Sequence, residues 1–373
     1  MRIAFLSTFY PFRGGIAQFN ANLYEAIRAA GHEAKAFTFT CQYPKILFPG
    51  KTQFVAPQDN AKPVESTRIL NSINPFSWRR TAREILRWKP DLVVFGYWMS
   101  FFAPSQAAVA RMLRRHGVKV ETVVHNAIPH EPRFFDKPLA RKFFRRNDGL
   151  VSMCNAVTAD IRRLCPDAQV VQHPHPIYDH FGARLERQQA MRQLGLDPQR
   201  RTLLFFGLIR DYKGLDLLID ALPLLGPEYQ LVIAGESYGS FDRYRAQIDA
   251  SGCADRIHLF NRYIGDKEVP LFFSAADLCV LPYRSATQSG ITAISLHFDL
   301  PLVATPVGGL LESVGETGVG VMAREASAEA IAEAVRRYFS GEGAGCRAAI
   351  AAFKERATWQ RFAEEVVLLA ERI

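Results

Sequence analysis

The loop 207–214 (GLIRDYKG) places an arginine and a lysine three residues apart between two glycines. An apolar run precedes the loop and a 3.6-residue periodicity follows it, so Arg210 and Lys213 are expected where a parallel strand passes into a helix. Open α/β sheets bind their ligands at this edge. A guanidinium fork and an ammonium group, backed by the N–H groups of a helix N-terminus, suit a diphosphate. Two solvated cations in a surface loop are the simpler alternative.

Other residues at predicted strand-to-helix junctions are small, polar or hydroxylated. They are Gly14, Gly15, Gln288, Ser289 and Gly290. Glycine lets the backbone approach a ligand closely, and free N–H groups at the start of a helix attract anions. A tight turn explains the glycine pair equally well, and Ser289 also fits an ordinary N-cap.

Two further side chains at strand ends can exchange protons or bind a polar ligand. His125 directly follows the predicted strand 118–124, where a histidine can donate or accept a hydrogen bond near neutral pH. A buried structural histidine is the alternative there. Glu312 follows the glycine turn 308–309 and supplies a carboxylate in the same context.

The elements that must position these residues alternate between short apolar runs and longer helical patterns, which is typical of βαβ units and a parallel sheet. The predicted strands are 3–6, 36–39, 92–95, 118–124, 150–152, 170–171, 202–206, 231–234, 257–260, 278–281 and 302–304. Residues 42–75, which are rich in proline, are expected to form a long loop region. The fold class is therefore α/β, with two doubly wound parallel sheets.

The length of 373 residues fits two domains. We expect an N-terminal Rossmann-like domain at 1–180 and a second one at 190–355. A polar, arginine-rich linker is predicted at 181–200, and the apolar spacing near the C-terminus predicts a closing helix at about 356–373.

Composition limits the classes of protein that the chain can belong to. Hydrophobic residues make up 48%, which excludes collagen-like and wholly disordered chains. The net charge of +9 indicates an anionic partner. Six cysteines without C-x-x-C or paired spacing predict neither a zinc site nor a disulfide framework, which fits a reducing cytoplasm. We expect neither a secretion signal nor a membrane-spanning helix, because no apolar run is long enough.

The excess charge is concentrated between residues 111 and 148, where ten lysines and arginines outnumber four acids. Within this region, 137–146 is predicted to form an amphipathic helix with a basic side. Such a helix can rest on an anionic membrane surface, at about 1 kcal/mol per basic residue. A core-packed helix with a solvated basic face is an equal alternative. Nucleic acid is not an expected partner, because no stacking platform or recognition motif accompanies the charge.

These motifs together resemble the retaining glycosyltransferases of family 4, which have the GT-B architecture of two Rossmann-like domains facing across a cleft. The likeness runs from end to end of the chain. It depends on the glycine pair after the first strand (Gly14, Gly15), the histidine after a middle strand (His125), the G-x-x-R/K-x-x-K-G clamp (Gly207, Arg210, Lys213) and the downstream Gly-Gly element with Glu312. The resemblance also implies that the closing helix packs back on the N-terminal acceptor domain.

What the resemblance implies is a hexosyltransferase that uses a nucleoside diphosphate sugar and retains the anomeric configuration. His125 would lie near the donor sugar, and Arg210 and Lys213 would neutralise the leaving diphosphate. The acceptor would be a saccharide or a lipid-linked glycan in envelope synthesis. We expect no metal and no other cofactor, and a cytoplasmic location that includes the inner face of the membrane.

One element departs from the family pattern. The family usually carries an E-x7-E pair beside the cleft, whereas alignment here gives Ala286 and Ile294, or Thr287 and Ser295 after a shift of one residue. The missing glutamates favour, as an alternative, a catalytically inactive protein of this type that binds a nucleotide or glycan and scaffolds a complex. A sugar-nucleotide 2-epimerase shares the architecture, but its acidic and histidine residues cannot be placed in this sequence.

Overall fold

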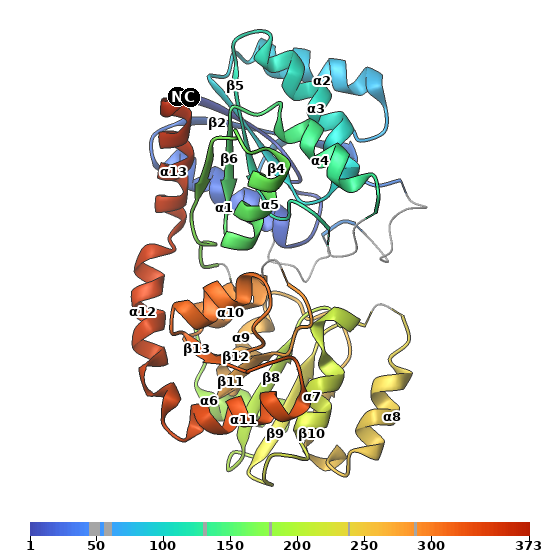
Figure 1. Cartoon of the computed structure of the whole chain (residues 1–373), viewed down its shortest axis with the longest axis vertical. Helices are drawn as coiled ribbons and strands as arrows, with labels where there is room; N and C mark the ends of the chain where they lie inside the picture. The colour runs from blue at the N-terminus through green and yellow to red at the C-terminus, as the bar shows by residue number, and fades with distance from the viewer. Residues whose placement is uncertain (45–52, 56–61, 130–132, 179–180, 238, 287–288) are drawn as a thin grey trace. The chain divides into compact units, whose positions relative to one another are not determined.

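A computed structural model shows that the chain folds into two α/β units, each built on its own sheet (Figure 1). The structure describes residues 1–44, 53–55, 62–129, 133–178, 181–237, 239–286 and 289–373. Unit 1 contains the described residues up to Pro176 and the returning segment Ala357–Ile373, and unit 2 contains those of Ile177–Arg356.

Among the described residues, unit 1 has a sheet of seven parallel strands in the order β3-β2-β1-β4-β5-β6-β7. The strands are β1 (Arg2–Leu6), β2 (Glu33–Cys41), β3 (Ser66–Asn71), β4 (Leu92–Tyr97), β5 (Lys119–Val124), β6 (Gly149–Ser152) and β7 (Val170–Gln172). The chain winds from β1 to one edge and then from β4 to the other. Doubly wound sheets bind ligands at the carboxyl ends of the strands beside this change of direction.

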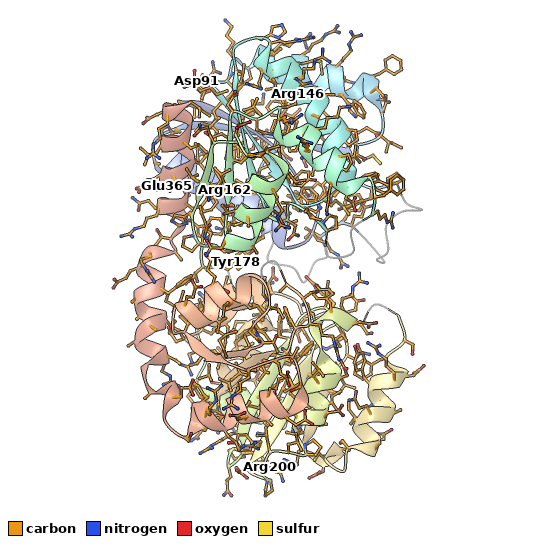
Figure 2. The ribbon with its side chains drawn as sticks, in the orientation of Figure 1. Asp91, Arg146, Arg162, Tyr178, Arg200 and Glu365 are labelled. Carbon is orange, nitrogen blue, oxygen red and sulfur yellow. The ribbon has the colours of Figure 1, made fainter. Side chains whose placement is uncertain are left out.

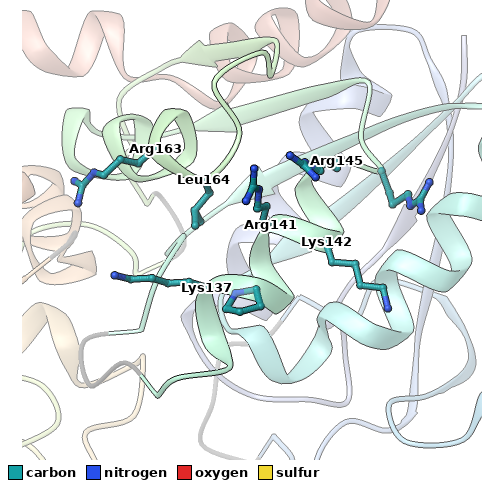
Figure 3. A pocket seen from close by; sticks show the side chains of 8 residues that line it. Lys137, Arg141, Lys142, Arg145, Arg163 and Leu164 are labelled. Carbon is teal, nitrogen blue, oxygen red and sulfur yellow. The ribbon is translucent and has the colours of Figure 1, made fainter.

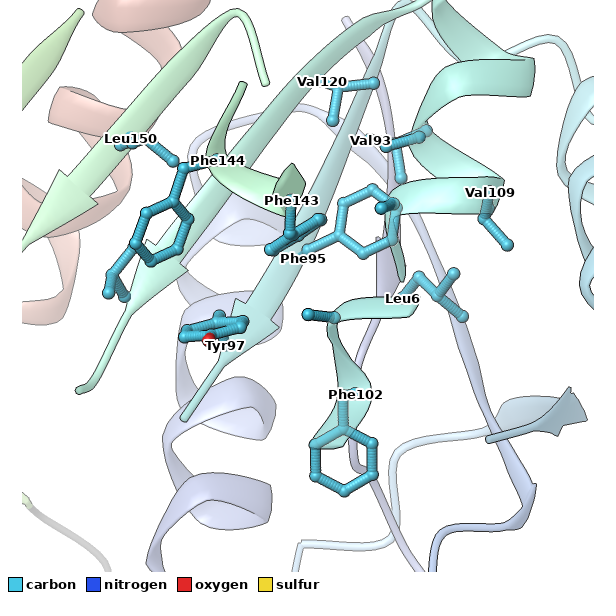
Figure 4. Packing of buried hydrophobic residues seen from close by; sticks show 14 of the residues in the cluster. Leu6, Val93, Phe95, Tyr97, Phe102, Val109, Val120, Phe143, Phe144 and Leu150 are labelled. Atoms are coloured by element: carbon cyan, nitrogen blue, oxygen red, sulfur yellow. The ribbon is translucent and has the colours of Figure 1, made fainter. Parts of the chain in front are cut away.

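Helices cover both faces of this sheet. They are α1 (Gly15–Ala29), α2 (Pro75–Arg87), α3 (Ala103–Arg114), α4 (Asp136–Phe144), α5 (Asn155–Leu164) and α13 (Trp359–Arg372), with the short 3-10 helix η2 (Ser100–Phe102) before α3. Side chains of alternate strand residues are buried on opposite faces, as expected for a parallel sheet covered on both sides. Leu6 and Phe95 pack with Phe143 on the face of α2 to α5 (Figure 4). Phe5 and Val94 pack on the face of α1 and α13.

The C-terminal helix α13 lies beside α1 in unit 1. Thr358 caps its N-terminus by accepting a hydrogen bond from the Arg361 N–H at 3.2 Å. Phe362 and Leu369 are buried in the core of that face. The Lys119 ammonium donates to the carbonyl of Ala370 at 2.7 Å, so a strand residue of unit 1 also holds the end of the helix.

The described part of unit 2 has a sheet of six parallel strands in the order β10-β9-β8-β11-β12-β13. The strands are β8 (Arg201–Phe206), β9 (Tyr229–Ala234), β10 (Ile257–Phe260), β11 (Leu278–Leu281), β12 (Leu302–Ala304) and β13 (Gly320–Met322). This sheet is also doubly wound, and its winding changes direction between β8 and β11. The loops after these two strands therefore occupy the expected ligand edge.

The helices of unit 2 again lie on both faces of the sheet. They are α6 (Arg187–Leu194), α7 (Leu215–Ala221), α8 (Asp242–Ala250), α9 (Val269–Ala275), α10 (Gly290–His297), α11 (Ala328–Phe339) and α12 (Cys346–Arg356). Leu203 and Phe205 of β8 share a core with residues of α7 and α11. Phe206 points the other way and contacts Phe273 of α9, with ring centroids 4.9 Å apart.

Two segments differ from the sequence prediction. The expected loop region 42–75 contains β3, whose mixed sequence STRILN does not alternate cleanly between apolar and polar residues. The expected linker 181–200 contains α6, which belongs to unit 2 and packs against α9. Its arginines and glutamines hide a narrow buried stripe that includes Met191 and Leu194, so a polar composition was mistaken for a linker.

Candidate functional site

The loop 207–214 lies at the carboxyl end of β8, and a positive φ favours glycine at both of its ends. Gly207 has φ +100°, and a Cβ there would lie 3.1 Å from Ile291 Cδ1 and 3.3 Å from Lys213 Nζ. Gly214 has φ +64°, and a Cβ there would lie 2.0 Å from the carbonyl oxygen of Pro282. The two glycines thus let the loop after β8 pack directly against the segment after β11.

The Lys213 ammonium is held inside this turn. The residue is 9% exposed, and its Nζ lies 5.5 Å from the centroid of the Tyr283 ring. Burial lowers the pKa of Lys213 to about 8, the Cys279 thiol opposes this shift, and the positive charge of Arg210 adds to it. No carboxylate of the described residues contributes to that pKa. Because a buried cation is costly without a counter-charge, the site favours an anionic ligand.

Arg210 stands at the outer end of the same turn. It precedes the 3-10 helix η3 (Asp211–Lys213), and its carbonyl accepts a hydrogen bond from the Lys213 N–H at 3.0 Å. Its side chain is exposed, in contrast to the buried Lys213. The structure therefore brings the two cations close enough for the charge of Arg210 to lower the pKa of Lys213.

The second loop presents the N-terminus of α10 to the first. Helix α10 begins at Gly290, directly after Ser289, and no side chain of the described residues caps its first turn. The Ser289 hydroxyl lies 3.3 Å from the hydroxyl of Tyr283, the residue whose ring contacts Lys213. Since Ile291 also touches the Gly207 position, an anion beside Lys213 would meet the uncapped helix end. Gln288 lies outside the described residues.

Arg284 links the two loops, a role that was not predicted from the sequence. Its guanidinium donates to both carboxylate oxygens of Asp216, at 2.8 and 2.5 Å. Its backbone N–H donates to the carbonyl of Tyr212 at 2.7 Å. A bidentate arginine–carboxylate pair fixes orientation as well as distance. The partners are 68 residues apart in the sequence, so no local pattern signals their contact.

Glu312 stands at the end of a third neighbouring strand. After β12 the chain turns through Gly308, at φ +49°, into the short π-helix η5 (Leu311–Glu316), which contains the half-buried Glu312. Because β12 is the neighbour of β11, this segment belongs to the same carboxyl edge as the loops after β8 and β11.

In unit 1 the glycine pair opens helix α1. Gly14 is the N-cap residue at φ +114°, a conformation that L-residues rarely adopt, and Gly15 is the first helical residue. No side chain caps the helix, and its first turn carries no acid. The pair therefore presents an uncapped helix N-terminus at the carboxyl end of β1.

His125 lies in an aromatic cluster of unit 1, directly after β5. Its backbone N–H donates to the carbonyl of Tyr97 at 2.8 Å, which continues the pairing of β5 with β4. Its ring stands edge-on to Phe19 of α1, with centroids 4.8 Å apart. Phe19 also contacts His175, at 5.2 Å, and Trp359 of the returning segment, at 4.9 Å. Neither Phe19 nor Trp359 was singled out as a partner of His125 from the sequence.

Both histidines of this cluster are neutral at physiological pH. Burial lowers the pKa of His125 to about 3, and the neighbouring His175 lowers it further. Burial also lowers the pKa of His175 to about 4, although a hydrogen bond from its Nδ1 to the carbonyl of Pro176, at 2.7 Å, opposes this shift. A neutral His125 can donate or accept a hydrogen bond, but it does not supply a positive charge.

The described residues show what chemistry each unit can support. Within this part of the chain, no group of three or more His, Cys, Asp or Glu side chains lies close enough to hold a metal ion. Unit 2 offers a buried ammonium, an exposed guanidinium and an uncapped helix end, which suit a diphosphate. Unit 1 offers a neutral histidine and a second uncapped helix end, which suit a polar, uncharged or weakly anionic group.

Two consecutive segments of the chain match glycosyltransferase domain families. Residues 14–176 match the Glycosyl transferase 4-like domain, and residues 186–360 match Glycosyl transferases group 1. The Anabaena protein Alr3699/HepE, solved in complex with UDP, has a TM-score of 0.74 and 15% sequence identity, with 100% of both chains covered. The fold is therefore shared over the whole length of the two chains.

Curated relatives match shorter stretches. The lipopolysaccharide core biosynthesis mannosyltransferase LpsB of Rhizobium meliloti (strain 1021) is 30% identical over 161 residues, which cover 40% of this chain and 44% of that protein. The GDP-mannose:glycolipid 4-beta-D-mannosyltransferase of Xanthomonas campestris pv. campestris is 28% identical over 204 residues, 53% of this chain and 54% of that protein. The chain thus spans about half the length of these curated relatives.

Proposed function

The chain has the GT-B fold of glycosyltransferases, and we propose that it is a retaining hexosyltransferase. It transfers a hexose from a nucleoside diphosphate sugar to a saccharide or lipid-linked acceptor in the synthesis of a cell-envelope glycan. The observation that carries this proposal is the buried Lys213 ammonium, which forms no salt bridge with the described residues and lies beside Gly207 and the N-terminus of α10.

The cations of unit 2 act on the leaving group. When the bond between the anomeric carbon and the diphosphate breaks, negative charge develops on the phosphate oxygens. Arg210 and Lys213, already fixed in place, then stabilise the transition state more than the bound donor. The acceptor oxygen bonds to the same face of the anomeric carbon, and its proton passes to the departing phosphate oxygen. Configuration is thereby retained.

The remaining predicted site residues bind the donor. Gly14 and Gly15 let the backbone of unit 1 approach it, and the neutral His125 hydrogen-bonds the sugar. Ser289 and Gly290 present the α10 N-terminus to the diphosphate, while Glu312 accepts hydrogen bonds from hydroxyl groups. Gln288 is assigned to the donor from the sequence alone. This chemistry uses no metal and no other cofactor.

The relatives support the choice of acceptor class. One is named a lipopolysaccharide core mannosyltransferase and the other a GDP-mannose:glycolipid mannosyltransferase, and the solved neighbour binds UDP. A hexose donor and a glycolipid or saccharide acceptor follow for this chain by analogy. The enzyme then works in the cytoplasm, at or near the inner face of the membrane where such acceptors are found.

The basic helix α4 is the proposed membrane contact. Among the described residues, no helix is both long and apolar enough to cross a bilayer. Helix α4 instead exposes basic side chains, and it is preceded by Phe134, which is 93% exposed, and Phe135, which is 36% exposed. Exposed aromatic rings beside basic residues are typical of segments that rest on a membrane surface. Co-sedimentation with vesicles should depend on anionic lipid, and lipid-independent sedimentation would contradict this role.

A catalytically inactive scaffold is the second candidate function, and the missing glutamate pair favours it. Ala286 and Ile294 stand at the two expected positions and are 7% and 8% exposed, so they place apolar groups there. With the alternative alignment the second position is Ser295, whose buried hydroxyl donates to the carbonyl of Leu300 at 2.9 Å. Neither alignment supplies a carboxylate to the donor.

Incubation of the full chain with UDP-, GDP- and ADP-hexoses separates the two candidates. An active enzyme raises its melting temperature with one nucleoside diphosphate and releases that diphosphate from the matching sugar. The anomeric configuration of the product, read by NMR, tests retention. Binding without any turnover, with or without extracted glycolipid as acceptor, would support the scaffold instead.

A further inference from the structure

A pocket of about 570 Å³ lies between helices α4 and α5 of unit 1 (Figure 3), and its lining includes none of the residues assigned to the donor. Its lining consists of Lys137, Pro138, Arg141, Lys142, Arg145, Arg146, Arg163 and Leu164. Six of these eight residues carry a positive charge and none carries a negative one. The volume falls within the range of small-molecule sites.

The pocket and the His125 cluster belong to opposite faces of the unit 1 sheet. Helices α4 and α5 pack on the face that holds Phe143 and Ile161, whereas His125 packs on Phe19 of α1, in the core of the other face. Figure 2 shows Arg146, at one end of the pocket, at the same edge of unit 1 as Asp91. Asp91 precedes β4, so this end of the pocket lies at the amino edge of the sheet.

Most of the positive charge in the pocket is not paired with an acidic side chain of the described residues. Arg163 pairs with Asp160, with 3.1 Å between Nη2 and Oδ1, and the charge of Lys137 also acts on Asp160. The remaining four cations (Arg141, Lys142, Arg145 and Arg146) form no salt bridge with the described residues. Asp136, the acid of α4, is buried and faces away, where it accepts hydrogen bonds from Ser100 and from the Arg133 N–H.

The spacing of these cations works against the helix that carries them. Lys137, Arg141 and Arg145 follow one another at intervals of four residues, and like charges at this spacing repel one another along a helix. The helix dipole favours Arg145 near the C-terminus but not Lys137 in the first turn. A helix that served only to pack against the core would gain no stability from this row of cations. A bound anion would reduce the repulsion between them.

The C-terminal end of α5 lies against part of the row of cations. Leu164, which lines the pocket, is 9% exposed, and the following Cys165 is 6% exposed. Burial raises the pKa of the Cys165 thiol, and the charges of Arg145 and Arg141 oppose this shift, with Arg145 hydrogen-bonded to the thiol. The Cys165 thiol lies 3.8 Å from the carbonyl of Arg141. Arg145 is exposed, but its hydrogen bond to the Cys165 thiol holds part of its side chain at the end of α5.

We propose that this pocket is a binding site for a phosphoryl group, in the form of a phosphate monoester or a diphosphate. Several guanidinium groups around one cavity match a tetrahedral anion with several oxygens better than they match a single carboxylate. The ligand is either the headgroup of an anionic lipid or a free phosphorylated molecule. If the phosphoryl group belongs to a lipid-linked acceptor, that assignment rests on the proposed function. Binding of a phosphoryl group in the pocket does not itself require sugar transfer.

Site-resolved arginine labelling tests the proposal on the full chain. Phenylglyoxal modifies accessible arginines, and mass spectrometry reads the extent of modification at each one. The ligands are inorganic diphosphate and phosphatidylcholine vesicles with or without phosphatidic acid. Arg79 and Arg80 of α2 are the internal control, because they are exposed arginines of unit 1 outside the pocket. Because the readout is local to α4, it does not depend on the donor site of unit 2.

Protection of Arg141 and Arg145 by diphosphate, without protection of Arg79, would identify a soluble phosphorylated ligand as the source. Protection by phosphatidic acid vesicles alone would identify a lipid headgroup. The variant R141E/R145E should weaken whichever binding is found by roughly tenfold or more, whereas R79E/R80E should not. If R141E/R145E fails to fold, R141Q/R145Q makes the same comparison.

Absence of protection by either ligand, or equal protection at the α2 arginines, would overturn the proposal. Failure of the proposed function gives a different result. In that case nucleoside diphosphate sugars are not turned over, although the pocket still protects its arginines. Conversely, loss of pocket binding would leave UDP or GDP binding at Lys213 unchanged.

Discussion

Substituting Glu121 with glutamine is predicted to stabilise unit 1, and the gain should increase with pH. Glu121 is 1% exposed in β5, and neither of its carboxyl oxygens has a hydrogen-bond partner among the described residues. A Cβ on Gly149 would lie 3.3 Å from Glu121 Cγ and 2.7 Å from Leu369 of α13. The carboxyl group thus lies in the apolar layer beneath the C-terminal helix, where its charged form is costly.

The size of the effect follows from its pKa. Burial raises the pKa of Glu121 from 4.5 to about 9, the charge of Asp148 raises it further, and Lys119 opposes the shift. Between these two values the folded protein holds a proton that the unfolded chain releases, so stability falls as the pH rises. The cost is absent below pH 4.5 and complete above pH 9. It amounts to roughly 3 kcal/mol at pH 7 and roughly 5 kcal/mol at pH 8.

Urea unfolding monitored by tryptophan fluorescence reports the free energy of unfolding of unit 1, because all four tryptophans belong to this unit (Trp78, Trp88, Trp98 and Trp359). The Glu121→Gln variant should match the unsubstituted protein within about 1 kcal/mol at pH 5 and exceed it by several kcal/mol at pH 8. Glu25→Gln, at an exposed position of α1, is the control and should change the free energy of unfolding by less than about 0.5 kcal/mol. A gain that does not change with pH, or a loss at every pH, would refute the reasoning.

Three further predictions concern the two sites. The pKa of Lys213 is lowered to about 8, so its charge is lost as the pH rises through that value. The affinity for UDP or GDP, measured by calorimetry, should therefore fall about tenfold from pH 7 to pH 9. The Lys213→Arg variant should show no such fall, because arginine keeps its charge. His125→Ala should lower kcat roughly a hundredfold. The pKa of His125 is about 3, so this residue should cause no change in kcat near pH 6.5. A change in kcat near pH 6.5 that disappears in the variant would contradict its neutral role. Gly214→Ala should destabilise unit 2 by about 3 kcal/mol or more, because the new Cβ would meet the Pro282 carbonyl. The control Gly195→Ala, at a similar φ of +67° in open space, should cost only about 1 kcal/mol. Urea unfolding monitored by circular dichroism measures both values.

Much of the fold could be predicted because its strands are continuous apolar runs. The strand 202–206 is an example, since β8 is buried on both faces and its sequence TLLFF shows this directly. Strand β3 could not be recognised, because its Ser, Thr and Arg residues interrupt the apolar pattern. Helix α6 was hidden for a similar reason, since it buries a narrow stripe under a polar surface.

The candidate site was predictable only where its signal is local. Gly207, Arg210 and Lys213 lie within one short loop, so the spacing alone predicts two cations at a strand end. The burial of Lys213 could not be predicted, because the ring of Tyr283 that contacts it comes from another loop. The same limit applies to the pair between Arg284 and Asp216, which depends on how two loops meet in space.

The proposed sugar transfer depends on Arg210 and Lys213, which hold the diphosphate of the donor. Calorimetric titration of the full chain with UDP and GDP tests it most directly. The unsubstituted protein should bind one of them, and R210A/K213A should bind it roughly a hundredfold more weakly or worse, because two charge-assisted contacts are lost. The control R192A/R245A, which removes two exposed arginines of unit 2, should retain full affinity. Unchanged affinity in a folded R210A/K213A protein would contradict the account.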